Sequence, residues 1–262
     1  MKIKFSKKNI VIIILLLLVF ALTVIIFKYN NYYDNRTYNE LKNAIIMNEN
    51  DKISKENNEK LIFITGHLDY NFEKLHDDLF DIYVETSKMM RWIETYQWVE
   101  YEETNKDGTK KYVYKKEWSS DIIDSNNFNN KEYKNPTKKY AENKLFIQKN
   151  IKIGEFNISE SVYDEIQYKS ILDLNTHMVL PEGFKKNGGY ITNSIDPKNP
   201  EIGDTRVAYV YSNWFYVSIL AKQNGNTVEK YTTKNNEKMI TIINNKQDFD
   251  TILNDYNYYI IK

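Results

Sequence analysis

Four glutamates close to aromatic side chains are the residues of this sequence best suited to carry out a reaction. A glycosidase needs two carboxylates, and aromatic rings stack well on sugars. The residues concerned are Glu94, Glu100, Glu102 and Glu117, with Trp92, Tyr96 and Trp98 beside them. Alternation along a strand would put positions 92, 94, 96, 98 and 100 on one face. That face suits carbohydrate, but a β-sheet also packs aromatic rings in this way, with charge pairs at its margin.

Other chemistry has weaker signals. The three histidines, His67, His76 and His177, have no partner at metal-ligand spacing. His76 is followed by two aspartates, which we interpret as a solvated loop. No nucleophile elbow surrounds Ser119 and Ser120. The chain has no cysteine, which excludes thiol catalysis and disulfides. We therefore predict no catalytic residue, no metal and no cofactor.

The glutamates lie in a predicted β-hairpin. Aromatic and β-branched residues fill positions 92–101 and 112–118, and Asp107-Gly108 lies between them as a two-residue turn that needs positive φ. Counting outward from this turn gives the expected register, which pairs Tyr101 with Tyr114, Glu100 with Lys115 and Gln97 with Trp118.

The remaining periodicity predicts a mainly β fold with minor α. Strands are expected at 61–66, 79–84, 145–158 with a break at Asn150, 189–192, 206–211, 214–222, 227–232 and 239–243. Helices are expected at 34–47, 161–171 and 246–256. The turn near Gly225 leaves two registers open, one pairing Lys222 with Glu229 and one pairing Ala221 with Val228. Two hairpin-centred blocks suggest two related modules, 58–158 and 189–262.

The first thirty residues predict a membrane anchor. An uncharged run from Ile10 to Phe27 would extend about 27 Å as a helix, close to the hydrocarbon core of a bilayer. A cleaved signal peptide is the alternative, but no small-residue cleavage site follows the run. Four lysines precede it and Lys28 follows, so the positive-inside rule keeps the amino terminus in the cytoplasm. The expected organisation is a cytoplasmic tail (1–9), a single transmembrane helix (10–28), a helical or loop linker (29–57) and a β-rich extracytoplasmic domain (58–262).

Charge excludes one class of partner. Without the four lysines before the span, 32 basic residues face 36 acidic ones, a net charge of −4. Nucleic-acid binding requires a basic surface. We therefore expect no nucleic-acid partner.

Several motifs in collinear order resemble the LUMA family, also called transmembrane protein 43. They are NEKLIFITGHL at 58–68, YQWVE at 96–100, YKKEWSS at 114–120, KNP at 134–136, IGEF at 153–156 and NPEIGDTRV at 199–207. The residues that carry the resemblance are Tyr96, Gln97, Trp98, Glu100, Glu117, Trp118, Asn135, Pro136, Gly154, Pro200, Gly203 and Asp204. The resemblance implies a large soluble part on the lumenal side of the membrane, and structural or contact roles for these residues. The family carries further membrane helices where this chain has the polar, tyrosine-rich segment 244–262, so the chain resembles a short, bacterial-type member.

Together these observations favour a membrane-anchored, non-enzymatic envelope scaffold or interaction protein. Its expected partners are the lipid bilayer, through residues 10–28, and a second copy of itself or another envelope protein. The alternative hypothesis is an envelope carbohydrate-binding protein or a glycan hydrolase that uses paired carboxylates.

Overall fold

The computed structural model describes residues 19–29, 36–70, 73–174, 178–256 and 260–261. Residues 19–29 and 36–41 are helical. The first part of the predicted membrane span, residues 10–18, lies outside the described residues. Over the described ranges, no helix combines the length and the apolar character needed to cross a bilayer.

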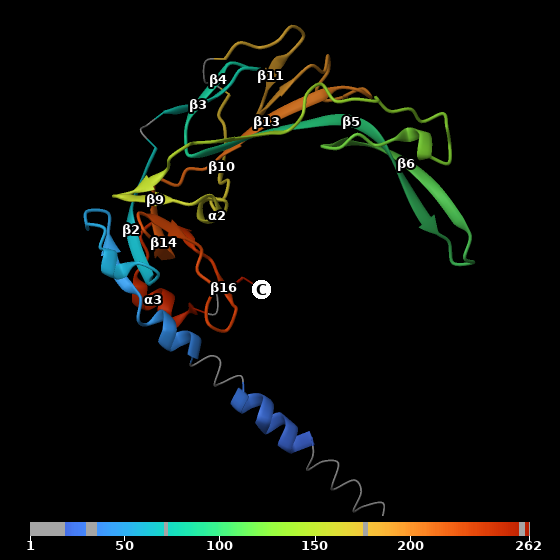
Figure 1. The fold of residues 1–262 in the computed structure, drawn as a ribbon. Helices are drawn as coiled ribbons and strands as arrows, with labels where there is room; N and C mark the ends of the chain where they lie inside the picture. Colours follow the sequence, from blue (N-terminus) through green and yellow to red (C-terminus); the bar gives the residue numbers. More distant parts are fainter. Residues whose placement is uncertain (1–18, 30–35, 71–72, 175–177, 257–259, 262) are drawn as a thin grey trace, which may run out of the picture. The chain divides into compact units, whose positions relative to one another are not determined.

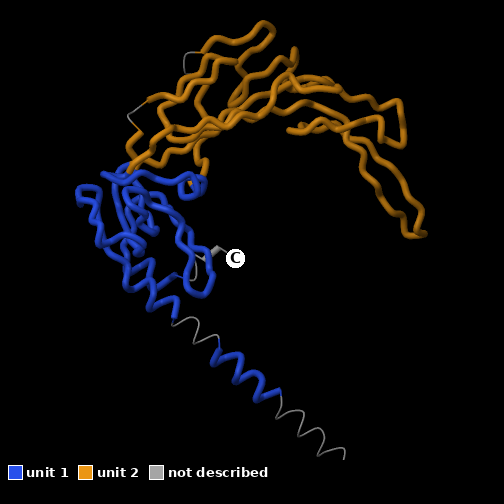
Figure 2. Tube along the Cα trace, viewed as in Figure 1, with its two compact units in different colours: residues 1–67, 153–165, 216–262 blue, residues 68–152, 166–215 orange. Residues whose placement is uncertain are grey.

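The chain forms two compact units that are discontinuous in sequence (Figure 2). Unit 1 contains residues 1–67, 153–165 and 216–262, and unit 2 contains residues 68–152 and 166–215. Each of the predicted modules, 58–158 and 189–262, contributes residues to both units. Their relation as a repeat stays a prediction.

Unit 1 is built on a seven-stranded sheet (Figure 1). Its order is β1 (Ile45–Asn48), β2 (Leu61–Asp69), β8 (Lys152–Ile153), β9 (Phe156–Ile158), β15 (Thr227–Glu229), β14 (Tyr216–Asn224) and β17 (Ile242–Asn244). β2 also pairs antiparallel with β14. The short helices α2 (Glu160–Tyr163) and α3 (Phe249–Asn254), the 3-10 turn η1 (Lys55–Asn57) and the pair β16 (Lys238–Met239) with β18 (Ile260–Ile261) complete the unit.

Apolar residues of the helix at 36–41, the sheet, β16 and the region of α3 form one core cluster of unit 1. They are Leu41, Leu61, Phe63, Leu220, Met239, Phe249, Ile252, Leu253 and Tyr256. The predicted buried stripe of α3 (Phe249, Ile252 and Leu253) is confirmed.

The second hairpin takes the register that pairs Lys222 with Glu229.

Unit 2 contains a second sheet around one long strand. The order is β11 (Lys185–Asn187), β12 (Tyr190–Thr192), β13 (Thr205–Tyr211), β5 (Lys88–Thr104) and β6 (Lys110–Ser119). β10 (Ser170–Ile171) pairs with β13, and β7 (Lys144–Ile147) pairs with β5. A separate hairpin joins β3 (Lys74–Asp77) to β4 (Ile82–Glu85), and η2 (Ser125–Asn127) is a 3-10 turn.

One face of β5 is buried and the other is open to solvent. Met89, Ile93 and Gln97 are fully buried, whereas Trp92 is 39% exposed. The buried face also contains a charge pair, in which Arg91 Nη1 donates to both carboxylate oxygens of Asp77 at 2.7 and 2.8 Å. The hydroxyl of Tyr209 donates to the same carboxylate, at 2.5 Å, and burial raises the pKa of that tyrosine. These hydrogen bonds compensate the cost of burying Asp77. The solvated loop predicted for His76 and the two aspartates is therefore wrong at Asp77, which ends β3 and is 1% exposed.

All three predicted helices are shorter in the structure than the sequence suggested, and the one at 246–256 is reduced to α3. In the predicted helix 34–47, residues 34–35 lie outside the described residues, residues 36–41 are helical, and the last residues from 45 onward belong to β1. β1 pairs in parallel with β2, so tertiary pairing overrides local helix propensity there. The predicted helix 161–171 is reduced to α2, and Ser170 and Ile171 pair with β13.

The register predicted for the first hairpin is wrong by one residue. Glu100 lies opposite Tyr114, Tyr101 opposite Val113 and Gln97 opposite Glu117. The loop is longer than a two-residue turn, because Asn105 N donates to Thr109 O and Gly108 N donates to Asn105 O. Gly108 has the expected positive φ, +83°. A three-residue loop with its glycine in the left-handed region therefore sets the register.

Gly154 permits a close approach within unit 1. A Cβ at this position would lie 2.2 Å from the carbonyl oxygen of Glu49, and φ is +55°. A Cβ on Gly66 would lie 2.5 Å from Glu49 Cβ. The carboxylate of Glu49 accepts a hydrogen bond from His67 N, at 2.6 Å. Because neither glycine has a side chain, the segment around Glu49 can pack closely against both Gly66 and Gly154.

We expect Gly108→Val to loosen the tip of the β5–β6 hairpin, because a β-branched residue resists positive φ. A residue forced into the left-handed region loses about 1–2 kcal/mol, which is roughly a 5–30-fold faster amide exchange at the tip. Gly189→Val is the matched control, since Gly189 is also in open space but has no positive φ. Equal exchange in the two variants would contradict the loop geometry.

We expect Gly154→Ala to destabilise the protein by about 3 kcal/mol, since it adds a backbone clash to left-handed strain. Gly188→Ala is the control, because Gly188 has nearly the same φ, +58°, with no atom within 4 Å of its Cβ position. Its cost should be about 1 kcal/mol. Thermal unfolding of both variants measures the difference. Equal loss in the two would show that the contact with Glu49 is not needed.

Candidate functional site

Most residues of the recognised motifs meet along one edge of β5. β13 pairs with β5 only as far as Thr95, opposite Thr205. The next residue, Tyr96, bonds to a loop instead: Tyr96 N donates to Asp204 O at 2.8 Å, and Tyr96 O accepts from Gly203 N at 2.9 Å. Pro200 precedes Glu201 in the same loop, and Glu201 N donates to the carboxylate of Asp204.

Asn135 continues this edge with its side chain. Its Oδ1 accepts from Trp98 N at 2.7 Å, and its Nδ2 donates to Trp98 O at 2.9 Å. The amide thus replaces a strand partner, because it supplies one donor and one acceptor to one backbone residue. Asn143 has a related role on the other edge, where its Oδ1 accepts from Ile93 N.

Gln97 fixes the segment that carries Asn135. Its side chain is fully buried, its Nε2 donates to Asp121 O at 2.8 Å, and its Oε1 accepts from Ile123 N at 3.0 Å. Pro136 lies close to Gly203, with its Cγ 3.7 Å from the Cβ position of that glycine. The three motifs that are distant in sequence are therefore neighbours in unit 2.

A layer of aromatic rings covers the same region. The rings of Tyr114 and Tyr133 stack at 3.9 Å between centroids, and Trp98 meets Tyr133 edge-on at 4.7 Å. Tyr96 contacts Trp118 at 5.1 Å. Such pairs contribute about 0.5–1.5 kcal/mol each beyond their burial.

Arg206 joins this layer to β12. Its guanidinium lies 4.6 Å from the ring of Trp118 and 4.7 Å from that of Tyr190, and its Nε donates to Glu94 at 2.5 Å. Lys116 lies over the ring of Trp98 at 5.1 Å. We call the solvent-facing side of these strands the outward face; it consists of Trp92, Glu94, Tyr96, Trp98, Tyr114, Lys116, Trp118, Tyr190 and Arg206.

The carboxylates considered for catalysis all have donors. Glu94 pairs with Arg206, Glu102 with Lys110 at 2.8 Å, and both oxygens of Glu117 accept from Tyr101 at 3.0 Å. Glu100 accepts from the hydroxyl of Tyr114 and from the backbone and side chain of Asn129. Burial alone would raise the pKa of Glu100, but these hydrogen bonds outweigh it and lower the pKa. The hydrogen bond from Lys110 lowers the pKa of Glu102. A general acid needs the opposite shift.

The histidines contact carboxylates. His67 Nδ1 lies 3.0 Å from Glu49, and His76 lies between Asp78 and Asp81 at 3.0 and 3.1 Å. His177 lies outside the described residues. In the part of the chain that the structure describes, no three histidine or acidic side chains are placed to hold a metal ion.

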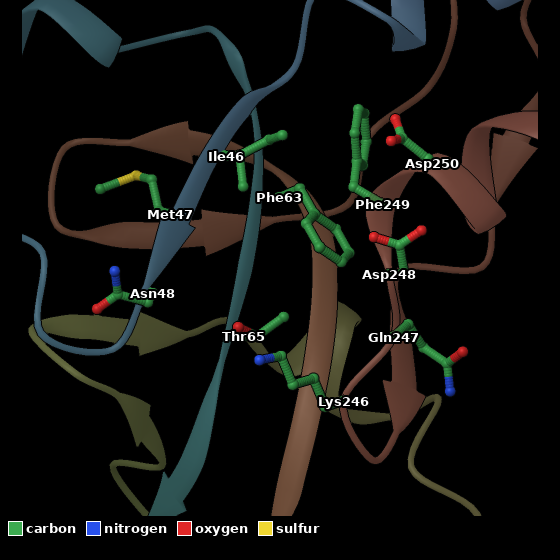
Figure 3. Close-up of a pocket in the computed structure, with 10 residues that line it drawn as sticks. All are labelled: Ile46, Met47, Asn48, Phe63, Thr65, Lys246, Gln247, Asp248, Phe249 and Asp250. Atoms are coloured by element: carbon green, nitrogen blue, oxygen red, sulfur yellow. The ribbon is translucent and has the colours of Figure 1, made fainter.

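Each unit contains a recess. One, of about 580 Å³, is in unit 1, with Phe63 and Phe249 among its walls and Lys246 and Asp248 also lining it (Figure 3). The other, of about 380 Å³, is in unit 2 and is lined by residues from Ile122 to Asn126 and from Lys134 to Thr137. The second adjoins Asn135 and Pro136, so it belongs to the region of the motifs.

Most residues of the predicted motifs lie in this region. The structure brings Tyr96, Gln97, Trp98, Glu100, Glu117, Trp118, Asn135, Pro136, Gly203 and Asp204 together in unit 2, while Gly154 lies in unit 1. The sequence analysis did not name four further residues of this region as site residues, namely Tyr114, Tyr133, Tyr190 and Arg206. A signal existed for Arg206, which follows Asp204 in the motif at 199–207, and for Tyr133, which precedes the motif at 134–136.

Comparisons with known proteins match this chain to one family. The family model described as Transmembrane protein 43 matches residues 95–258. Transmembrane protein 43 of Rattus norvegicus is 29% identical over 208 residues, and that of Homo sapiens is 28% identical over the same length; each alignment covers 72% of this chain and 52% of the relative. The Transmembrane protein 43 homolog of Drosophila melanogaster is 27% identical over 175 residues, covering 62% of this chain and 46% of the relative.

The chain thus spans about half the length of the curated relatives it matches. No solved structure matches it. The family model covers well over half of the chain, including the hairpin, Asn135 and the loop that ends at Asp204, and the chain therefore belongs to the Transmembrane protein 43 family.

Proposed function

We propose that the protein is a membrane-anchored, non-enzymatic scaffold whose outward face binds another envelope protein or a second copy of itself. The observation that supports this most is the use of the motif residues. Asn135, Gln97 and Gly203 hydrogen-bond to backbone groups around β5. Groups used in this way hold a surface in shape rather than act on a substrate.

The outward face has the composition of a contact surface. Interfaces are enriched in tryptophan, tyrosine and arginine, and these residues dominate binding energies. Trp92 and Tyr190 are 39% and 38% exposed and lie on strands fixed by the sheet. Two charges of the face, Arg206 and Glu94, pair with each other, and Lys116 lies over the ring of Trp98. A partner would therefore meet rigid rings with little uncompensated charge.

The glycan hydrolase hypothesis receives no support from the described carboxylates. A hydrolase needs one carboxyl that stays protonated to donate to the leaving group. The pKa values of Glu100 and Glu102 are lowered, and Glu94 is engaged by Arg206. The outward face supports a binding role better than a hydrolytic one.

The membrane anchor and its direction are part of the same proposal. The family name of the relatives refers to a transmembrane protein. The uncharged run 10–27, with four lysines before it, supports a single span with the domain on the extracytoplasmic side.

We expect the full-length protein, purified in detergent, to show no hydrolysis of cell-wall glycan. The assay is release of reducing ends, with Glu100→Gln and Glu117→Gln as companion variants. Turnover that persists through repurification and is abolished in either variant would refute the non-enzymatic proposal.

We expect Trp92→Ala to weaken association measured by crosslinking of the full-length protein in its native membrane. An exposed tryptophan at the centre of an interface contributes about 2 kcal/mol or more, so the loss should be roughly 30-fold. Tyr83→Ala is the control, because Tyr83 is 48% exposed but lies on β4, outside the outward face. Equal crosslinking by both variants and the parent would show that this face is not the interface.

A further inference from the structure

The helix at 36–41 is fixed to the body of unit 1. Leu41 is 1% exposed and packs in the core, and Thr37 is fully buried. Both carboxylate oxygens of Glu40 accept from Lys234 N at 3.0 Å, and the hydroxyl of Tyr231 donates to Glu40 as well. The helix and the segment around Lys234 therefore form one structure.

The loop from Thr232 to Lys238 is held in place by the same helix. Thr37 Oγ1 donates to Glu237 at 2.5 Å, and Asn235 Nδ2 donates to Thr37 Oγ1 at 2.7 Å. Thr233 N donates to Glu237 O at 2.9 Å within the loop. Two acidic side chains, Glu40 of the helix and Glu237 of the loop, are thus turned toward helix–loop hydrogen bonds.

The basic side chains of the region have no such partners. Arg36, Lys42, Lys234 and Lys238 are exposed, and none forms an ion pair with a described residue. By contrast, nearby Lys230 pairs with Glu165 at 2.8 Å. We call these four unpaired cations the basic face. Arg36 and Lys42 come from the helix at 36–41 and the residue after it, and Lys234 and Lys238 come from the loop 232–238.

The basic face follows directly on the proposed membrane span. Residues 30–35 separate the helix at 19–29 from that at 36–41, and such a connection spans at most about 25 Å. Lysine and arginine near an anionic bilayer are attracted to it within about one Debye length, roughly 10 Å. We propose that the basic face binds the anionic phospholipid headgroups of the membrane in which the chain is anchored. This inference rests on the proposed membrane anchor.

The absence of cysteine from the chain allows a direct test. A single cysteine at the exposed Thr232 carries a nitroxide, and the full-length protein is reconstituted into vesicles with a trace of nickel-chelating lipid. We expect more collisions between label and headgroup nickel in vesicles of phosphatidylcholine with phosphatidylglycerol than in phosphatidylcholine alone. Each lysine near the surface contributes about a five-fold preference, so Lys234→Gln with Lys238→Gln should remove most of the difference.

The control variant carries Lys149→Gln with Lys152→Gln. These lysines are exposed and come shortly before Ile153. The side chain of Ile153 lies 3.1 Å from the Cβ position of Gly66, and Gly66 is near the end of β2 opposite to Leu61. This control should retain the preference for anionic vesicles. If the protein floats with the vesicles, two results would overturn the proposal: equal collision rates in the two lipid mixtures, or an equal loss of the preference in both double variants. Protein that fails to float would overturn the membrane anchor itself.

Discussion

The hydrogen bonding of β5 is the constraint on which unit 2 depends. This strand runs for 17 residues, from Lys88 to Thr104, and a buried backbone group without a partner would cost about 1–3 kcal/mol. No single neighbour is long enough to pair with all of it. On one edge β7 is followed by the amide of Asn143 and then by β6. On the other edge β13 is followed by the loop at Gly203 and Asp204 and then by Asn135.

This arrangement explains why the motifs are distant in sequence. The three elements around residues 96–100, 134–136 and 199–207 complete one another's hydrogen bonds. Gln97 binds the segment that leads to Asn135, and Pro136 lies against Gly203. A change in one motif therefore leaves donors or acceptors of the other two unpaired. The same bonds hold the outward face, because Tyr96 and Trp98 are both the paired backbone residues and members of the aromatic layer.

Unit 1 meets a different constraint, which is to hold the helix at 36–41 against a β-rich body. Leu41 enters the core, and Glu40 and Thr37 bind the loop before β16. Motion of the helix at 36–41 is thereby coupled to unit 1. The glycines at 66 and 154 have a comparable role around Glu49, where any side chain would collide with that residue.

Local chemistry was readable from the sequence alone. The alternation of β5, the positive φ of Gly108, the break at Asn150 and the buried stripe of α3 each depend on residues near in sequence, and the structure confirms them. The family was also readable, because its motifs keep their order along the chain. The second half of the predicted helix 34–47 was wrong, since the pairing of β1 with β2 outweighs its local preference there, whereas residues 36–41 are helical. The register predicted for the β5–β6 hairpin was wrong, because the hydrogen bond from Asn105 N to Thr109 O closes a three-residue loop where a two-residue turn was predicted. Only the tertiary structure showed that Asn135 and the loop at Gly203 pair with β5, or that Arg206 lies between Trp118 and Tyr190. Those contacts join residues up to about a hundred positions apart, and no periodicity in the sequence records which distant backbone group a side-chain amide will bind.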